Sequence, residues 1–177
     1  MANDVEAQKV YLKLCLAKPQ IAFNSLFWTY NPRQQAGQRN LPFILRPPQE
    51  LAVDVLTGAI NTGYDVGINK SRDEGATEII SKMFALFLLL VPETSFLVGS
   101  RKEEYVDKTG DPKSIFAKID YALKHLPKWV SLNMERTHLH IRNRDNEAVI
   151  DGEATNENFG AGARATAILL DEFGRVE

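Results

Sequence analysis

The chain has one cysteine, no long apolar run and no marked excess of either charge among its 177 residues. A lone cysteine excludes an internal disulfide and a cysteine-rich zinc site, so we expect Cys15 to be a buried thiol on the first helix. The longest apolar run, Met83–Val91, is far short of the roughly 20 residues that a membrane-spanning helix needs. With 21 Lys and Arg against 23 Asp and Glu, bulk charge alone does not indicate a nucleic-acid-binding protein. These absences favour one soluble domain with no membrane partner.

The first 41 residues differ in pattern from the rest of the chain. Apolar positions between Asn3 and a Lys18-Pro19 stop predict a short helix over residues 3–17. Prolines, a glycine and a polar stretch predict a loop over residues 30–48. We therefore expect residues 1–41 to form an N-terminal helix and loop arm, and residues 42–177 to form the core.

In the core, the apolar pattern alternates between helices and strands. The pattern predicts helices over 48–62, 77–91 and 113–126, and strands over 65–69, 95–99, 137–143, 147–151 and 165–170. Such alternation favours an α/β fold with a mostly parallel sheet and helices on both faces. The last strand is apolar on both faces, which predicts a central place in that sheet. Ligands of such folds bind beyond the carboxyl ends of the strands.

A charged turn, KSRDEGAT, follows the predicted strand at 65–69 and leads into a helix. A phosphate-binding turn needs backbone amides at a helix start, a cation and a hydroxyl for Mg²⁺. Gly75 permits a close turn, Lys70 or Arg72 supplies the cation, and Thr77 is placed to bind the metal. The common pattern GxxxxGK[ST] is not met, because Ala76 stands at the usual lysine position. An ordinary charged turn is therefore the alternative interpretation.

Two adjacent carboxylates, Asp171 and Glu172, follow the last predicted strand. In nucleotide hydrolysis, the first acid of such a pair binds Mg²⁺ and the second polarises the attacking water. A strand that ends in acids only because its loop is solvated is the alternative. The turn and the acid pair are 94 positions apart, in the order and structural context that hydrolysis of a nucleotide requires.

Four segments resemble the ATPase domain of the large terminase subunit of tailed bacteriophages. KSRDEGAT is similar to that family's phosphate-binding loop, in which the lysine leads the loop, and RPPQELAVDVL resembles its glutamine-bearing segment. FLVGSRKEEYVDKTGDPKSIFAKIDYALKHLPKW resembles the family's second strand and following helix, and IDGEATNENFGAGARATAILLDEF resembles the run into its Walker B strand. The resemblance covers residues 42–177 and implies a RecA-like P-loop NTPase fold.

The resemblance assigns roles to residues of both motifs. It implies that Lys70 holds the triphosphate, that Thr77 and Asp171 hold Mg²⁺, and that Glu172 is the catalytic glutamate. Around them, it implies contributions from five further residues: Gly75 as the loop glycine, Gln49 as an adenine-reading residue, Arg72 as a charge sensor or finger, and Ser71 and Ala76 in the nucleotide-binding turn. A helix cap is the alternative for Gln49, and a solvated turn residue is the alternative for Arg72.

The same resemblance implies the partners and the setting. The family uses ATP and Mg²⁺ to package double-stranded DNA into an empty capsid, as a homo-oligomeric ring with a portal protein and a small terminase subunit. This would take place in the host cell cytoplasm.

The chain also departs from the family. It ends five residues after Glu172, so we expect a partial ATPase core without the next strand, the coupling segment or the nuclease domain. The glycine-rich run before Walker B offers only Arg164, which leaves a trans-acting arginine unassigned.

A basic stretch over residues 124–144 is a candidate DNA contact. If residues 137–143 form one strand, five alternating side chains lie on one face: Arg136, His138, His140, Arg142 and Arg144. The three arginines, with Arg101 and Lys102, are the candidate contacts to DNA phosphates. A solvated outer strand is the alternative. The two histidines could also bind a metal, but the sequence offers no third ligand.

Two other functions fit parts of this pattern. One is a helicase-like nucleotide hydrolase with the same core, and the other is a non-catalytic α/β domain that descends from such an enzyme.

Overall fold

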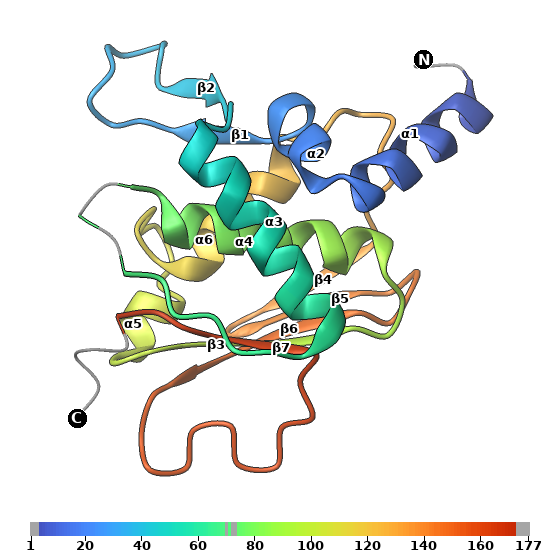
Figure 1. Ribbon diagram of the computed structural model, residues 1–177. Coiled ribbons are helices and arrows are strands. Elements are labelled where there is room, and N and C mark those ends of the chain that lie inside the picture. Colours follow the sequence, from blue (N-terminus) through green and yellow to red (C-terminus); the bar gives the residue numbers. More distant parts are fainter. Residues whose placement is uncertain (1–3, 70, 72–73, 173–177) are drawn as a thin grey trace.

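The computed structural model describes residues 4–69, 71 and 74–172 (Figure 1). The helices in these ranges are α1 (Val5–Ala17), α2 (Pro19–Ser25), α3 (Pro47–Thr62), α4 (Ala76–Leu90), α5 (Glu103–Val106) and α6 (Ile115–Lys124). The strands are β1 (Trp28–Tyr30), β2 (Asn40–Pro42), β3 (Ser95–Ser100), β4 (Met134–Thr137), β5 (His140–Asn143), β6 (Val149–Ala154) and β7 (Ala167–Leu170). In these ranges, no helix is both long and apolar enough to cross a membrane.

The main sheet has five strands in the order β4-β5-β6-β3-β7, and its direction is mixed. β3 runs parallel to β6 and to β7, whereas β5 runs antiparallel to β4 and to β6. Figure 1 shows α3, α4 and α6 on one side of the sheet and the loop of residues 155–166 on the other. The prediction of a mostly parallel P-loop NTPase sheet, with helices on both faces, is therefore wrong.

Short connections explain the antiparallel half of the sheet. The predicted strand over 137–143 is in fact a hairpin, in which His138 and Leu139 form a two-residue turn between β4 and β5. Strands joined by so short a turn must run antiparallel. Leu139 has a φ of 57°, a left-handed conformation that glycine or asparagine would have signalled in the sequence. The alternating side chains over residues 137–143 continue through this turn, so the pattern alone predicted one strand.

Two further predictions about strands are wrong. Residues 65–69 form no strand, and β7 lies at the edge of the sheet rather than at its centre. The side of β7 that faces the 155–166 loop is only partly covered, because Ile168 is 51% exposed. The apolar run over 165–170 reflects one buried face, on which Leu169 packs, and one open face.

The apolar core lies between the sheet and α4. This helix is apolar on nearly all sides, and it is correspondingly buried along most of its length. Phe84 of α4 stacks on Phe96 of β3 with ring centroids 4.4 Å apart. α1 and α2 pack on the same core, where Cys15 is fully buried as the sequence predicts.

The opposite face of β3 is covered by a close approach of the 155–166 loop. A Cβ atom on Gly99 would lie 2.3 Å from the ring of Phe159, so only glycine leaves room for this ring. Gly160 of the same loop lies against Leu97.

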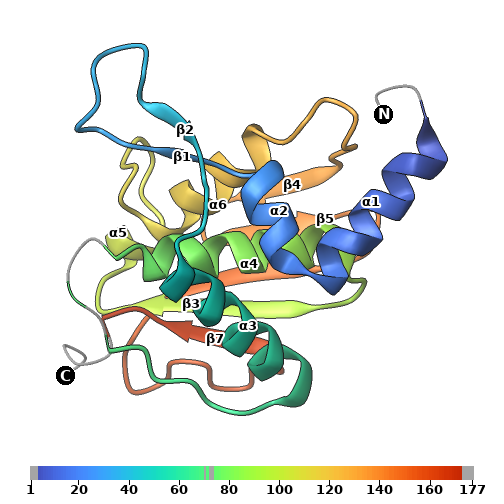
Figure 2. The same cartoon turned by 45° about the horizontal axis from the view of Figure 1, so that its top comes forward.

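The predicted loop arm contains a hairpin, β1–β2, that projects from the body of the molecule (Figure 2). α6 holds its base. The Tyr30 and Tyr121 rings meet edge to face at 6.5 Å, and the Tyr121 hydroxyl donates to Asn40 Oδ1 at 2.7 Å.

A charged cluster connects the β4–β5 hairpin to the helices. Arg136 donates to both carboxylate oxygens of Asp107, at 2.8 and 2.9 Å, and to Asp120, while its guanidinium lies over the Phe116 ring. Burial acts to raise the pKa of Asp107, but the hydrogen bonds from Arg136 and from the Leu139 amide outweigh it and lower that pKa.

We predict that Asp107→Ala lowers the free energy of unfolding by about 2 to 4 kcal/mol, because it leaves a half-buried guanidinium without its main partner. Urea denaturation measures the loss. Because the pKa of Asp107 is lower in the folded chain, its contribution is present above about pH 4 and disappears as the pH falls through the folded value. The difference in the free energy of unfolding between wild type and variant should therefore become smaller in acid.

The control is Glu147→Gln, which removes the exposed partner of Arg142 and should change stability little. Equal losses for the two variants would contradict the structural role of Asp107.

Candidate functional site

The phosphate-turn candidates lie at the start of α4. Lys70 and Arg72 fall outside the described residues, and Ser71 is exposed. Gly75 precedes the helix with a φ of 79°, a left-handed conformation that favours glycine. It has no side chain to cap the helix, and among the described residues no side chain accepts from the first-turn amides of residues 76–78. An uncapped helix start of this kind can bind an anion.

Thr77 and Asp171 meet at this helix start. The Thr77 hydroxyl donates to Asp171 Oδ1 at 3.1 Å, although the two residues are 94 positions apart. Asp171 is held there because β7 pairs with β3, and its own amide donates to the Gly99 carbonyl at 2.9 Å. Two oxygen groups that are predicted to bind one metal therefore lie in contact.

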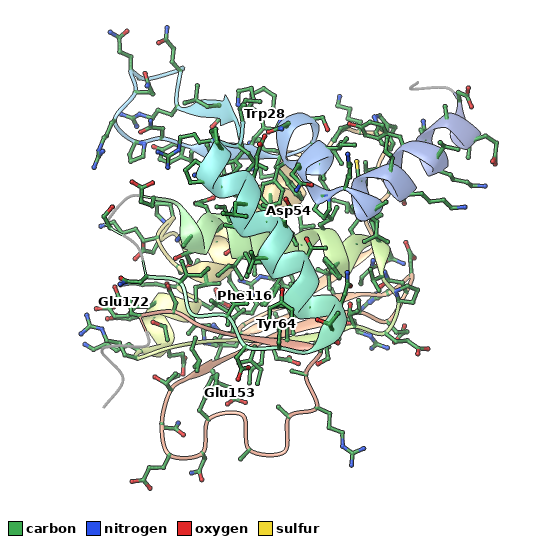
Figure 3. The ribbon with its side chains drawn as sticks, viewed as in Figure 1. Trp28, Asp54, Tyr64, Phe116, Glu153 and Glu172 are labelled. Atoms are coloured by element: carbon green, nitrogen blue, oxygen red, sulfur yellow. The ribbon has the colours of Figure 1, made fainter. Side chains whose placement is uncertain are left out.

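Glu172, the predicted catalytic glutamate, lies beside Arg101. The Arg101 Nε is 3.5 Å from Glu172 Oε2, and its guanidinium rests over the Tyr105 ring. Arg101 directly follows β3, so the parallel pairing of β3 with β7 brings these two side chains to the same end of the sheet. Figure 3 shows Glu172 at that end, on the side where α5 lies.

Gln49 bridges α3 and the turn. Its Oε1 accepts from the Arg46 amide at 3.0 Å, which is the helix-capping role that the alternative interpretation predicts. Its Nε2 also donates to the Glu74 carbonyl at 3.1 Å, immediately before Gly75. Gln49 thus fixes the turn as well as the helix.

A pocket of about 300 Å³ opens between α3, residues 68–69 and the start of α4. Its wall is mostly apolar, with Ala52, Leu56, Ile68 and Ile79, and Gln49 supplies an amide. Ala76 lines it as well. Asn69 and Glu74 also line the pocket, and a mostly apolar wall with a few polar groups is the general composition of a ligand pocket.

Two acids beside this helix start, Glu74 and Glu78, form ion pairs with cations. Glu74 pairs with Arg46 at 2.8 Å, and Glu78 pairs with Lys82, which is fully buried and lies over the Phe43 ring. A bound anion would therefore meet little net negative charge from these two residues.

Sequence reasoning missed Lys118 of α6. Its Nζ donates only to backbone carbonyls among the described residues, those of Lys113 and Ser114. Burial lowers the pKa of Lys118, and Lys82 adds to this, while Glu78 and Asp171 act in the opposite direction. A lysine inside an amphipathic helix belongs to no motif, so the sequence does not predict that the charge of Lys118 acts on Asp171.

Thr155 is a second missed residue. It follows β6, whose carboxyl end lies at the same edge as those of β3 and β7. Its hydroxyl is buried and has no hydrogen-bond partner in the described part of the chain. The sequence contains no motif that would distinguish it.

The candidate DNA contacts do not share one face, because the predicted strand is a hairpin. Each is within 4.0 Å of a carboxylate: Arg101 of Glu172, Lys102 of Glu104, Arg136 of Asp107 and Asp120, Arg142 of Glu147, and Arg144 of Glu135. The positive charges of these candidate DNA contacts are therefore paired with carboxylates of the protein itself.

The two candidate metal-binding histidines also have separate partners. His138 meets Glu103 at 2.8 Å and His140 meets Asp151 at 2.6 Å. Across residues 4–69, 71 and 74–172, no three His, Cys, Asp or Glu side chains gather into a metal site.

Arg164, the one arginine of the glycine-rich run, lies on the other side of the sheet. It lines a polar pocket of about 380 Å³ together with Asp151 and Glu153.

Comparisons with known proteins add no assignment. No protein-family model and no curated protein matches the chain.

We predict that Lys118→Met raises the melting temperature at pH 7, because burial makes the charged lysine unfavourable in the folded chain. The pKa of Lys118 is lower in the folded than in the unfolded state. The penalty is therefore present below the folded pKa and vanishes as the pH rises toward about 10.4. In thermal melts from neutral to alkaline pH, the melting temperatures of wild type and Lys118→Met should converge.

Lys124→Met, on the exposed end of the same helix, is the matched control and should show no such pH dependence. A less stable Lys118→Met protein at pH 7 would mean that the lysine serves the fold.

Proposed function

We propose that this chain binds Mg-ATP at the start of α4 and hydrolyses it as the motor part of a viral large terminase subunit. The observation that carries the proposal is the Thr77–Asp171 contact, which joins the two sequence motifs at one uncapped helix start. The resemblance of residues 42–177 to terminase ATPase domains supports the choice of reaction. The proposal rests on this site and not on the sheet, whose mixed direction differs from the expected fold.

The oxygen atoms at this site fit Mg²⁺. A hydroxyl and a carboxylate are oxygen ligands that Mg²⁺ prefers, and Thr77 and Asp171 would hold the ion. Their oxygens lie 3.1 Å apart. Mg²⁺ held there would neutralise phosphate charge.

The neighbouring groups supply the other parts of the reaction. The free amides of residues 76–78 donate to phosphate oxygens, and the helix dipole favours negative charge at that point. Glu172 accepts a proton from the attacking water, and Arg101 fixes the direction of that carboxylate. Lys70, which the resemblance assigns to the triphosphate, adds a cation to the turn.

The nucleotide base fits the 300 Å³ pocket beside the turn. Its apolar wall would contact the face of an adenine ring, and each polar atom of the Gln49 amide keeps one further hydrogen-bonding position for the edge of the ring.

The larger function follows from the resemblance. Hydrolysis would drive double-stranded DNA into a procapsid in the host cytoplasm, with a ring of identical chains, a portal protein and a small terminase subunit as partners. In the isolated chain, the immediate expectation is binding of Mg-ATP.

We predict that Thr77→Ala weakens Mg-ATP binding by about tenfold or more, because it removes an oxygen ligand of the metal. Binding of ATP in the presence of a chelator should change little, since the amides of α4 remain. Isothermal titration with and without Mg²⁺ separates the two effects.

Thr57→Ala is the control, since that hydroxyl donates to the Val53 carbonyl within α3. An equal loss of affinity with and without Mg²⁺ would remove Thr77 from the metal site, and a wild-type chain that binds no nucleotide would refute the proposal.

Glu172→Gln should leave Mg-ATP binding intact and lower hydrolysis by about 10²- to 10⁴-fold, because the amide cannot accept the proton of water. Phosphate release from the whole protein is the measurement. Glu153→Gln, on the other face of the sheet, should hydrolyse ATP at the wild-type rate. Hydrolysis by Glu172→Gln within a few-fold of wild type would exclude this glutamate as the base.

A further inference from the structure

A second pocket lies on the face of the sheet that is opposite to α4, beneath the loop of residues 155–166. It encloses about 380 Å³ between that loop and the strands β3 and β6. Ile150 and Gly152 of β6 face the core, so the alternating side chains of Asp151 and Glu153 face the loop. Figure 3 shows Glu153 on that side of the sheet. The pocket is therefore separate from the candidate nucleotide site at the start of α4.

The loop that closes this pocket is held against the sheet by hydrogen bonds and by packing. At its end, the Ser95 amide donates to Thr166 Oγ1 at 3.1 Å. Near its middle, the Gly160 amide donates to Glu153 Oε2 at 3.1 Å, and the Phe159 ring packs on β3. These contacts give the pocket its shape before any ligand enters, which lowers the entropic cost of binding.

Two carboxylates of β6 line the pocket, and each is oriented through one of its oxygens. Asp151 Oδ1 lies 2.6 Å from His140 Nδ1, and Glu153 Oε2 accepts from the loop. In the described part of the chain, Asp151 Oδ2 and Glu153 Oε1 accept no hydrogen bond. A carboxylate can accept through both oxygens, so each of these acids keeps one oxygen for a ligand.

The positive charge of this pocket comes from Arg164 of the loop. Among the residues that the structure describes, its guanidinium makes no hydrogen bond and no ion pair, whereas Arg142 of β5 pairs with Glu147. Asp151 and Glu153 line the same pocket, yet neither of them forms an ion pair with Arg164. The pocket therefore presents charges of both signs that do not neutralise each other.

We propose that this pocket binds a free basic amino acid, with its carboxylate on Arg164 and its two cationic groups on Asp151 and Glu153. A guanidinium matches a carboxylate in shape and donates two parallel hydrogen bonds to it. The lining residues carry two negative charges and one positive charge, so a ligand with a net charge of +1 is complementary. Alternate residues of a strand are about 6.6 Å apart, which leaves room for two separate cationic groups. The proposal does not depend on nucleotide hydrolysis.

The test is a titration of the whole chain with L-lysine, followed through the NMR signals of its backbone amides. The amides of Gly152, Ala163 and Ala165, which line the pocket, should shift with a Kd of about 1 mM or below. Cadaverine has both ammonium groups of lysine but no carboxylate, so it should bind about tenfold more weakly. L-norleucine lacks the side-chain ammonium and should also bind more weakly than L-lysine.

Three variants assign the contacts. Arg164→Gln should weaken L-lysine binding by about tenfold without weakening cadaverine binding, because only lysine presents a carboxylate to the guanidinium. Asp151→Asn should weaken the binding of both ligands. Arg142→Gln removes the same charge as Arg164→Gln but outside the pocket, so this control should bind both ligands as wild type does. Thermal melts verify that each variant is folded.

The proposal is overturned if L-lysine at about 10 mM shifts none of the pocket amides, if cadaverine binds as tightly as L-lysine, or if Arg164→Gln binds L-lysine as wild type does. The peptide Gly-Gly-Lys separates a free amino acid from the end of a protein chain, because its lysine has no α-ammonium group. Binding of this peptide as tight as that of L-lysine would also overturn the proposal.

Discussion

The parallel pairing of β3 with β7 is the constraint on which the candidate site depends. Four consecutive pairs of residues align the two strands, from Phe96 with Ala167 to Gly99 with Leu170. This register places Arg101 beside Glu172 and directs Asp171 toward the start of α4. A shift of one residue would turn these side chains to the other face of the sheet. The burial of Leu169 in the core opposes such a shift of β7, since this side chain would turn to the face on which Ile168 is exposed.

The sequence predicted most helices because their signals are local. Pro47 and Pro48 begin α3, Gly63 ends it in a left-handed conformation, and the apolar run of α4 leaves no alternative to burial. The order of the strands is a different matter, because pairing joins residues that are far apart in the chain. The turn at Leu139, without glycine or asparagine, left no signal that the sheet reverses direction there.

The candidate site shows the same division. Thr77 and Asp171 were named from their positions after a turn and after a strand, and the structure brings them into contact. Lys118 and Thr155 could not be named, because a lysine within a helix and a threonine after a strand are ordinary in sequence. The carboxylate partners of the arginines were equally invisible, since Asp107 and Arg136 are 29 positions apart. The sequence thus predicts candidate groups but not the charges that surround them.

The close contact between Gly99 and Phe159 links the two sides of the sheet mechanically. The carbonyl of Gly99 receives the amide of Asp171, and the Phe159 ring rests where a side chain of residue 99 would otherwise stand. Gly99 therefore both fixes the position of Asp171, the candidate metal ligand, and provides the surface on which the 155–166 loop packs. Because no side chain separates them to absorb movement, a displacement of that loop displaces the strand that carries Gly99.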